Sequence, residues 1–86
     1  MKGHEELKLT EEEISCGIPM IVIYDHPRDF PGVSYVARVW KGINPGRVYM
    51  TSNSIIAIRH AIRKYTNLNK APRLPGDDPA IAEVWI

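Results

Sequence analysis

The hydrophobic residues of this chain recur with two different periods, which together predict four strands and one long helix. Residues 52–65 repeat their apolar positions at 100° per residue, which predicts an amphipathic helix. Short apolar runs, rich in β-branched residues and bounded by turn residues, predict strands at 20–24, 33–40, 47–51 and 81–86. We therefore expect a small α+β domain of order β-β-β-α-β, with a mostly antiparallel sheet and one helix packed on one face.

The predicted helix has an apolar face and a basic face. The apolar face, which is expected to cover the sheet, holds Ile55, Ile58, Ala61, Ile62 and Tyr65. The opposite face holds Arg59, His60, Arg63 and Lys64, with Ile56 exposed among them. Burial of a large apolar side chain contributes about 1.5–3 kcal/mol, so Ile58→Asp is expected to unfold the domain. Thr51 or Ser52 is the expected N-cap.

Strand alternation and turn residues orient the predicted sheet. The face expected to enter the core holds Val33, Tyr35, Ala37 and Val39. Residues 42–46 are expected to form the turn before the third strand, and 66–80 form a long connection with no clear period. If the last strand joins the sheet in parallel, a right-handed crossover brings it there.

Length and the polar N-terminus set the domain boundaries. A chain of 86 residues supports one core, which we place at 18–86. Residues 1–17 are expected to be a polar tail or a short frayed helix. Thr10 and Glu13 have the spacing of a capping box, and Gly17 and Pro19 stop the helix that follows.

Charge is distributed unevenly along the chain, although the formal net charge is only +1. Residues 1–29 hold three basic and seven acidic side chains, whereas residues 30–76 hold eight basic side chains and no acidic one. A basic middle of this kind favours contact with a polyanion, and a solvated charged surface is the alternative explanation.

The candidate binding residues form two sets. A basic set on the helix and the following loop would neutralise phosphates of a nucleic acid or another polyanion, and consists of Arg59, Arg63, Lys64, Lys70 and Arg73. Ile56 and Trp40 are the candidate protein contacts. The favoured hypothesis is a non-enzymatic protein-interaction module with an accessory or regulatory role, which binds another protein or a second copy of itself. Binding of nucleic acid or another polyanion is the alternative.

Candidate catalytic and metal-binding clusters are weak. Asp25, His26 and Asp29 place an imidazole near carboxylates, as acid–base catalysis requires, but aspartate before His-Pro is also common in turns. Asp77 and Asp78 precede a proline and fit an Asx-type turn. Phosphate-binding loops, nucleophile elbows and cysteine pairs are missing from the sequence, which therefore predicts no enzyme, no cofactor and no metal ion.

The compartment is predicted from cysteine usage and hydropathy. Cys16 is the single cysteine, so an internal disulfide is excluded and a reducing compartment is favoured. No apolar run reaches the roughly 20 residues that span a bilayer, and the first residues are acidic, unlike a signal peptide. We expect a cytoplasmic protein without a membrane partner.

Several short motifs resemble a group of small uncharacterised proteins from bacterial genomes and prophages. These motifs are Tyr24-Asp25-His26-Pro27, Phe30-Pro31, Tyr35-Val36-Ala37-Arg38 and the ending from Asp77 to Ile86. The resemblance covers about residues 20–86 and implies a compact bacterial domain without implying an activity. In element order the chain is also similar to HicB-type antitoxins and double-stranded RNA-binding domains. It lacks the Pro-Asp-x-Pro-Gly turn of the former and the Lys-Lys-x-Ala-Lys helix start of the latter, so neither function is carried over.

Overall fold

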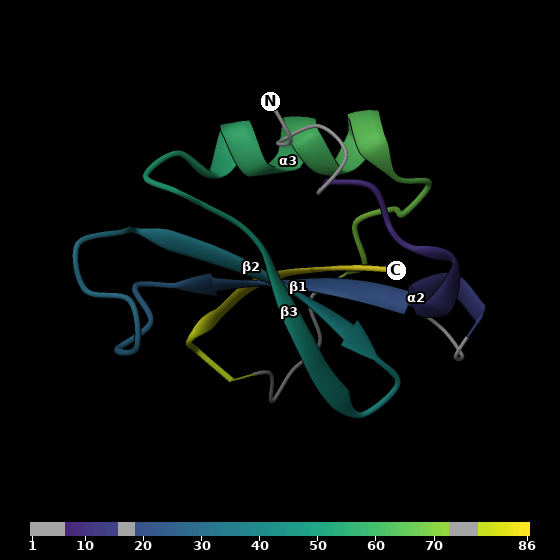
Figure 1. Ribbon diagram of the computed structural model, residues 1–86. Coiled ribbons are helices and arrows are strands. Elements are labelled where there is room, and N and C mark those ends of the chain that lie inside the picture. The colour runs from purple at the N-terminus through teal and green to yellow at the C-terminus, as the bar shows by residue number, and fades with distance from the viewer. Residues whose placement is uncertain (1–6, 16–18, 73–77) are drawn as a thin grey trace.

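The computed structural model is a four-stranded antiparallel sheet with a helix lying over one face (Figure 1). It describes residues 7–15, 19–72 and 78–86. The sheet has the order β3-β2-β1-β4, formed by β1 (Pro19–Asp25), β2 (Tyr35–Lys41), β3 (Asn44–Ser52) and β4 (Ile81–Trp85). Helix α3 (Ile55–Tyr65) covers the sheet, and the short helix α2 (Glu11–Ser15) lies at one end of it. The predicted fold class is confirmed.

The last strand enters the sheet antiparallel to β1, with Ile21 opposite Trp85 and Ile23 opposite Glu83. The parallel crossover considered from the sequence is therefore not formed. After α3 the chain first runs beside the outer edge of β4, where Asn69 N donates to Ile86 O and Ala71 N donates to Val84 O, both at 2.8 Å. It must then reverse before it enters β4, and this reversal sets the direction of the strand.

The turn between β2 and β3 is shorter than predicted. It is a two-residue hairpin of Gly42 and Ile43, in which Gly42 takes a φ of +64° that favours glycine. Pro45 and Gly46, which were expected in the turn, already belong to β3. The pairing register of β3 with β2 shifts in this region, and such an irregularity on an edge strand tolerates a proline.

Helix α3 begins three residues later than predicted. Thr51 and Ser52 still pair with β2, so neither of them caps the helix, and that prediction is wrong. Ser54 is the N-cap, because its backbone is extended and its side chain accepts a hydrogen bond from Ala57 N at 3.4 Å. Residues of the long strand β3 therefore lead almost directly into the helix.

The core lies between α3 and the face of the sheet that the helix covers. It consists of Ile21, Ile23, Ala37, Val39, Tyr49, Ile58, Ala61, Ile62 and Trp85. Tyr35, Ile55 and Tyr65 are partly buried against it, as expected from their positions. On the second face of the sheet Val36 is nevertheless only 2% exposed. The sheet therefore buries apolar groups on both faces.

Candidate functional site

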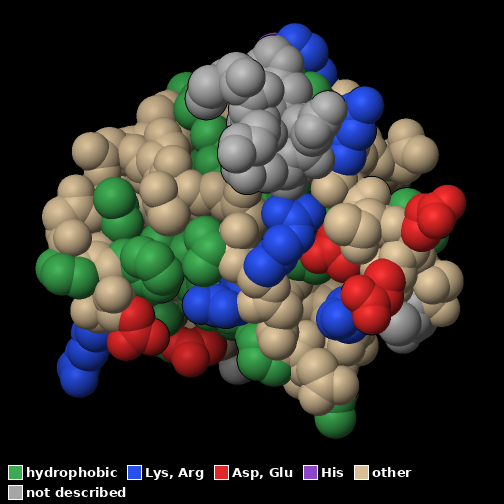
Figure 2. Space-filling model, viewed as in Figure 1, with side chains coloured by type: hydrophobic (Ala, Val, Ile, Leu, Met, Phe, Trp, Pro, Cys, Tyr) green, Lys and Arg blue, Asp and Glu red, His purple; other side chains and the backbone are tan. Residues whose placement is uncertain are grey.

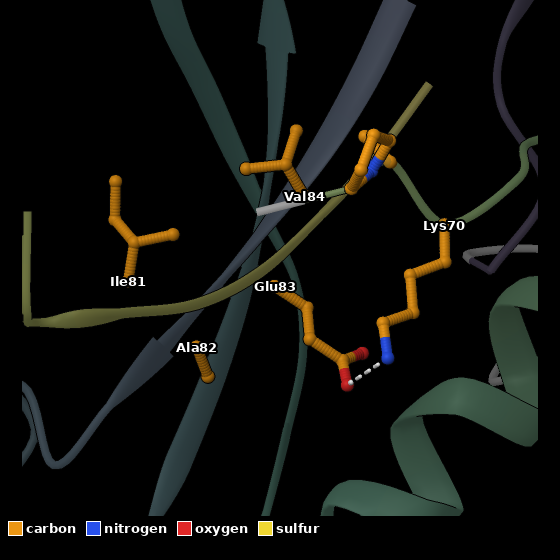
Figure 3. A pocket seen from close by; sticks show the side chains of 7 residues that line it. Lys70, Ile81, Ala82, Glu83 and Val84 are labelled. Carbon is orange, nitrogen blue, oxygen red and sulfur yellow. Dashed lines mark ion pairs between the residues drawn. The ribbon is translucent and has the colours of Figure 1, made fainter. Parts of the chain in front are cut away.

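The basic residues predicted to bind an anion gather in part around one buried carboxylate, that of Glu83 on β4. Arg59 binds this carboxylate through Nε at 2.8 Å and through Nη2. Lys70 Nζ lies 3.5 Å from Glu83 Oε2, the oxygen that Arg59 also binds. Figure 3 shows Glu83 and Lys70 pointing toward one another beside α3. The Glu83 side chain is only 5% exposed. Two of the predicted anion-binding cations therefore have a carboxylate of the chain itself as their partner.

The environment of Glu83 keeps this carboxyl group ionised. Burial by itself raises the pKa of Glu83, but the hydrogen bonds from Arg59 and Trp85 and the charges of Arg59 and Lys70 outweigh it, so the net pKa lies below the usual value of 4.5. The Trp85 Nε1 donates to Glu83 Oε1 at 3.1 Å. The hydrogen bond between Arg59 and Glu83 also raises the pKa of Arg59, so both partners stay charged. Glu83 thus fastens α3 and the segment after it to β4.

Of the other predicted site residues, Arg63 lies beside this ion pair, since it lines one pocket with Lys70 and Trp85. Arg63 places its guanidinium 5.2 Å from the ring centre of Trp85, and Lys64 lies 5.5 Å from the ring centre of Tyr65. Arg73 lies outside the described residues. Ile56 is 70% exposed on α3, as the helical period predicted. Trp40 is half-buried on β2, and its indole Nε1 donates to the hydroxyl of Tyr24.

The Asp25–His26 pair is exposed on the surface. His26 Nδ1 is hydrogen-bonded to Asp25 Oδ1, and His26 has a φ of +51° where the chain leaves β1. Among the described residues no group of three His, Cys, Asp or Glu side chains lies close enough to hold a metal ion. Asp78 Oδ1 accepts a hydrogen bond from Ala80 N at 2.9 Å, the Asx-type turn expected there.

The N-terminal segment is held on the domain by a second buried carboxylate. Glu13 Oε1 accepts from Thr10 N and Thr10 Oγ1 accepts from Glu13 N, so the predicted capping box is formed. Arg47 Nε binds Glu13 Oε2 at 2.9 Å, and Arg47 Nη2 donates to Lys8 O at 3.0 Å. Burial by itself raises the pKa of Glu13. The hydrogen bonds from Arg47 and Thr10 and the charge of Arg47 outweigh this effect, so the net pKa lies below the usual value of 4.5.

An apolar groove, here called the end groove, lies where α2, the end of α3 and the start of β1 meet. It is lined by Lys8, Leu9, Ile14, Pro19, Tyr65, Thr66, Asn67, Leu68 and Ile86. These segments all lie at the right-hand end of the molecule in Figure 1. Two of the lining side chains are large and exposed, Ile14 at 56% and Ile86 at 51%.

The end groove is not predictable from the sequence, because its walls come from four separate segments. The one local signal was Ile14, an isoleucine that directly follows three glutamates. A large apolar side chain in such a polar segment indicates either a core contact or an exposed contact surface. Only the packing of this segment against the domain shows that Ile14 belongs to an exposed contact surface.

Charges of both signs lie next to one another on the molecular surface. In Figure 2, Lys and Arg side chains neighbour Asp and Glu side chains along the lower and right-hand parts of this face, while hydrophobic side chains gather on the left. The basic middle of the sequence therefore does not form an uninterrupted basic surface on this side of the molecule. Acidic side chains interrupt it.

Comparison of the chain with protein-family models, with curated proteins and with solved structures gives no match. Within the described residues, the helices are too short or too polar to cross a membrane.

Proposed function

We propose that this protein is a protein-interaction module, and that its partner inserts an apolar side chain or short apolar segment into the end groove. The observation that carries the proposal is the pair of isoleucines, Ile14 and Ile86, which are each more than half exposed on the same groove. Single exposed apolar residues are normal on a protein surface, but a contiguous apolar patch is typical of a binding site.

Side chains that line the end groove also pack against the hydrophobic core, so the groove is formed before a partner binds. Leu9, Tyr65 and Leu68 are partly buried and pack against the hydrophobic core. The ion pair of Glu13 with Arg47 fixes α2, which carries Ile14, on the same side. A partner that binds a preformed groove loses less conformational entropy than one that must order it.

Binding of a nucleic acid or another polyanion, the alternative from the sequence, is supported less well. Arg59 and Lys70 are directed at Glu83, so an incoming phosphate would compete with a buried carboxylate for them. Arg63 and Lys64 remain exposed on α3. Two such side chains supply few of the phosphate contacts on which strong polyanion binding depends.

Site-specific photocrosslinking tests the protein-interaction proposal. A benzoylphenylalanine residue is placed at position 14 or 86, and at position 43 as the control, because Ile43 is 89% exposed at the hairpin tip and does not line the groove. We expect a defined crosslinked product from positions 14 and 86 only. A product of twice the chain mass would identify the partner as a second copy.

The identified partner is then titrated with purified variants. Ile14→Asp and Ile86→Asp are expected to weaken binding at least about tenfold, which corresponds to 1.4 kcal/mol, while Ile43→Asp leaves it unchanged. An affinity equal in all three variants would overturn the proposal. Binding of an oligonucleotide that falls steeply with salt and is lost in Arg63→Glu/Lys64→Glu would replace it with the polyanion alternative.

A further inference from the structure

A second groove lies on the face of the sheet that α3 does not cover. Because side chains alternate along a strand, Tyr24 on β1 and Trp40 on β2 point away from the core that holds Ile23 and Val39. The groove, here called the aromatic groove, is lined by Tyr24, Pro27, Asp29, Phe30, Val36, Arg38, Trp40 and Pro45. It shares no residue with the end groove.

Three aromatic rings of this groove are partly exposed, and two of them are fixed in position. Trp40 Nε1 donates to the Tyr24 hydroxyl at 3.1 Å. The register places Tyr24 opposite Val36 and Trp40 opposite Met20, so this hydrogen bond requires the two side chains to lean toward one another along the strands. Phe30, from the loop between β1 and β2, is the third ring, and all three are half-buried.

The polar groups of the groove carry one charge of each sign. Arg38 Nη1 donates to Gly46 O at 2.6 Å, which holds the guanidinium against β3. Gly46 lies so close to β2 that a Cβ added there would be 2.9 Å from Val39 O. A guanidinium has five N–H donors, and the bond to Gly46 uses one of them. Asp29 is exposed at the rim.

We infer that the aromatic groove binds a proline-rich protein segment in the polyproline II conformation. Such a segment has unpaired backbone carbonyls and rigid rings, and grooves lined with aromatic residues recognise it. Here the rings of Tyr24, Phe30 and Trp40 would receive prolines, and the Tyr24 hydroxyl and the Arg38 guanidinium would donate to carbonyls. Asp29 would accept from a basic residue beside the prolines.

The charge of the groove favours this ligand over single-stranded nucleic acid. Nucleic acids also stack on aromatic rings, but their binding depends on several cations along the backbone. Arg38 is the one cation among the lining residues, and the carboxylate of Asp29 opposes it. A peptide backbone has no net charge, so the Asp29 carboxylate does not repel it. The inference does not rest on the proposed role of the end groove.

Nuclear magnetic resonance with peptide probes tests the inference. The ¹⁵N-labelled protein is titrated with a decaproline peptide up to about 1 mM, and with a glycine–serine decamer as the control. The protein contains two tryptophans, Trp40 and Trp85, and a Trp40→Phe variant assigns their indole signals. We expect saturable shifts at the Trp40 indole with decaproline, none at Trp85, which is 2% exposed, and none with the control peptide.

Variants separate this groove from the end groove. Phe30→Ala, a change in a loop residue outside the hydrophobic core, and Trp40→Ala are each expected to weaken decaproline binding at least about tenfold. Ile86→Asp is expected to leave decaproline binding unchanged. Absence of a Trp40 shift, or equal shifts with the glycine–serine decamer, would overturn the inference. Shifts with a thymidine decanucleotide but not with decaproline would assign the groove to nucleic acid.

Discussion

At the scale of single residues, two carboxylates explain how the uneven charge of the sequence is balanced. Glu13 comes from the acidic N-terminal part and Glu83 from the acidic C-terminal part, and both are more than nine-tenths buried. Each binds an arginine from the basic middle, Arg47 and Arg59 respectively. Two arginines of the basic middle therefore hold the N-terminal segment and β4 on the domain.

Replacing Glu83 is expected to destabilise the protein in a pH-dependent manner. Because its folded pKa is lowered, the ionised Glu83 stabilises the protein above the unfolded value of 4.5, and this contribution is lost as the pH falls through the lower folded value. Glu83→Gln is expected to reduce the free energy of unfolding by about 1–3 kcal/mol at pH 7, because it leaves Arg59 without its anionic partner.

Denaturant titration between pH 7 and pH 3 measures this effect. The difference in unfolding free energy between the wild type and Glu83→Gln should shrink as the pH falls, because the side chain at position 83 is then uncharged in both proteins. Glu12→Gln, at an exposed position of α2, is the control and should change stability by less than about 0.5 kcal/mol. A difference that stays constant with pH would contradict the role of the charge.

At the scale of elements, α3 has the amphipathic pattern that the sequence predicted but begins at a different residue. Thr51, Ser52 and Ser54 all have side chains suited to an N-cap. Strand pairing with β2 extends to Ser52, and the Asn53 side chain accepts a hydrogen bond from Ser34 N at 2.8 Å, which leaves Ser54 to cap the helix. Competition between sheet and helix for the same short segment therefore decides the boundary.

Removing the cap is expected to destabilise the protein moderately. Ser54→Ala deprives Ala57 N of its acceptor and should cost about 1 kcal/mol of unfolding free energy. Ser54→Asp should retain most of the stability, because aspartate is also a good N-cap and places a negative charge at the helix N-terminus. Chemical denaturation of the three proteins measures both effects, and equal losses in both variants would argue against capping by Ser54.

At the scale of the whole molecule, the sheet separates a helix-covered core from a second apolar face, and the two proposed docking grooves lie in different places. The end groove lies at one end of the molecule beside α2, whereas the aromatic groove lies on the sheet face opposite α3. The two sites could therefore be occupied independently. This arrangement suits a small protein that links two partners.

Two neighbouring isoleucines of α3 test the assignment of core and surface. Ile58 is fully buried between the helix and the sheet, whereas Ile56 is 70% exposed. Ile58→Asp is expected to unfold the domain, since a buried unpaired charge costs several kcal/mol. Ile56→Asp should leave the thermal unfolding midpoint nearly unchanged. Circular dichroism melting distinguishes the two, and a folded Ile58→Asp protein would contradict the packing described here.

The sequence by itself determined the features that depend on neighbouring residues. The 3.6-residue period of residues 55–65 defined the buried side of α3, the alternation in 35–40 defined the two faces of β2, and the Thr10–Glu13 spacing predicted the capping box. Each is a local pattern, because backbone geometry fixes which side chains share a face.

The tertiary structure alone decided the direction of β4, the partners of the arginines and the two grooves. Arg59 meets Glu83 across 24 residues of sequence, and Arg47 meets Glu13 across 34. Ile14 and Ile86, which are far apart in the sequence, line the same groove. These contacts form only when distant segments pack, and neither residue period nor charge count specifies which distant segments will meet.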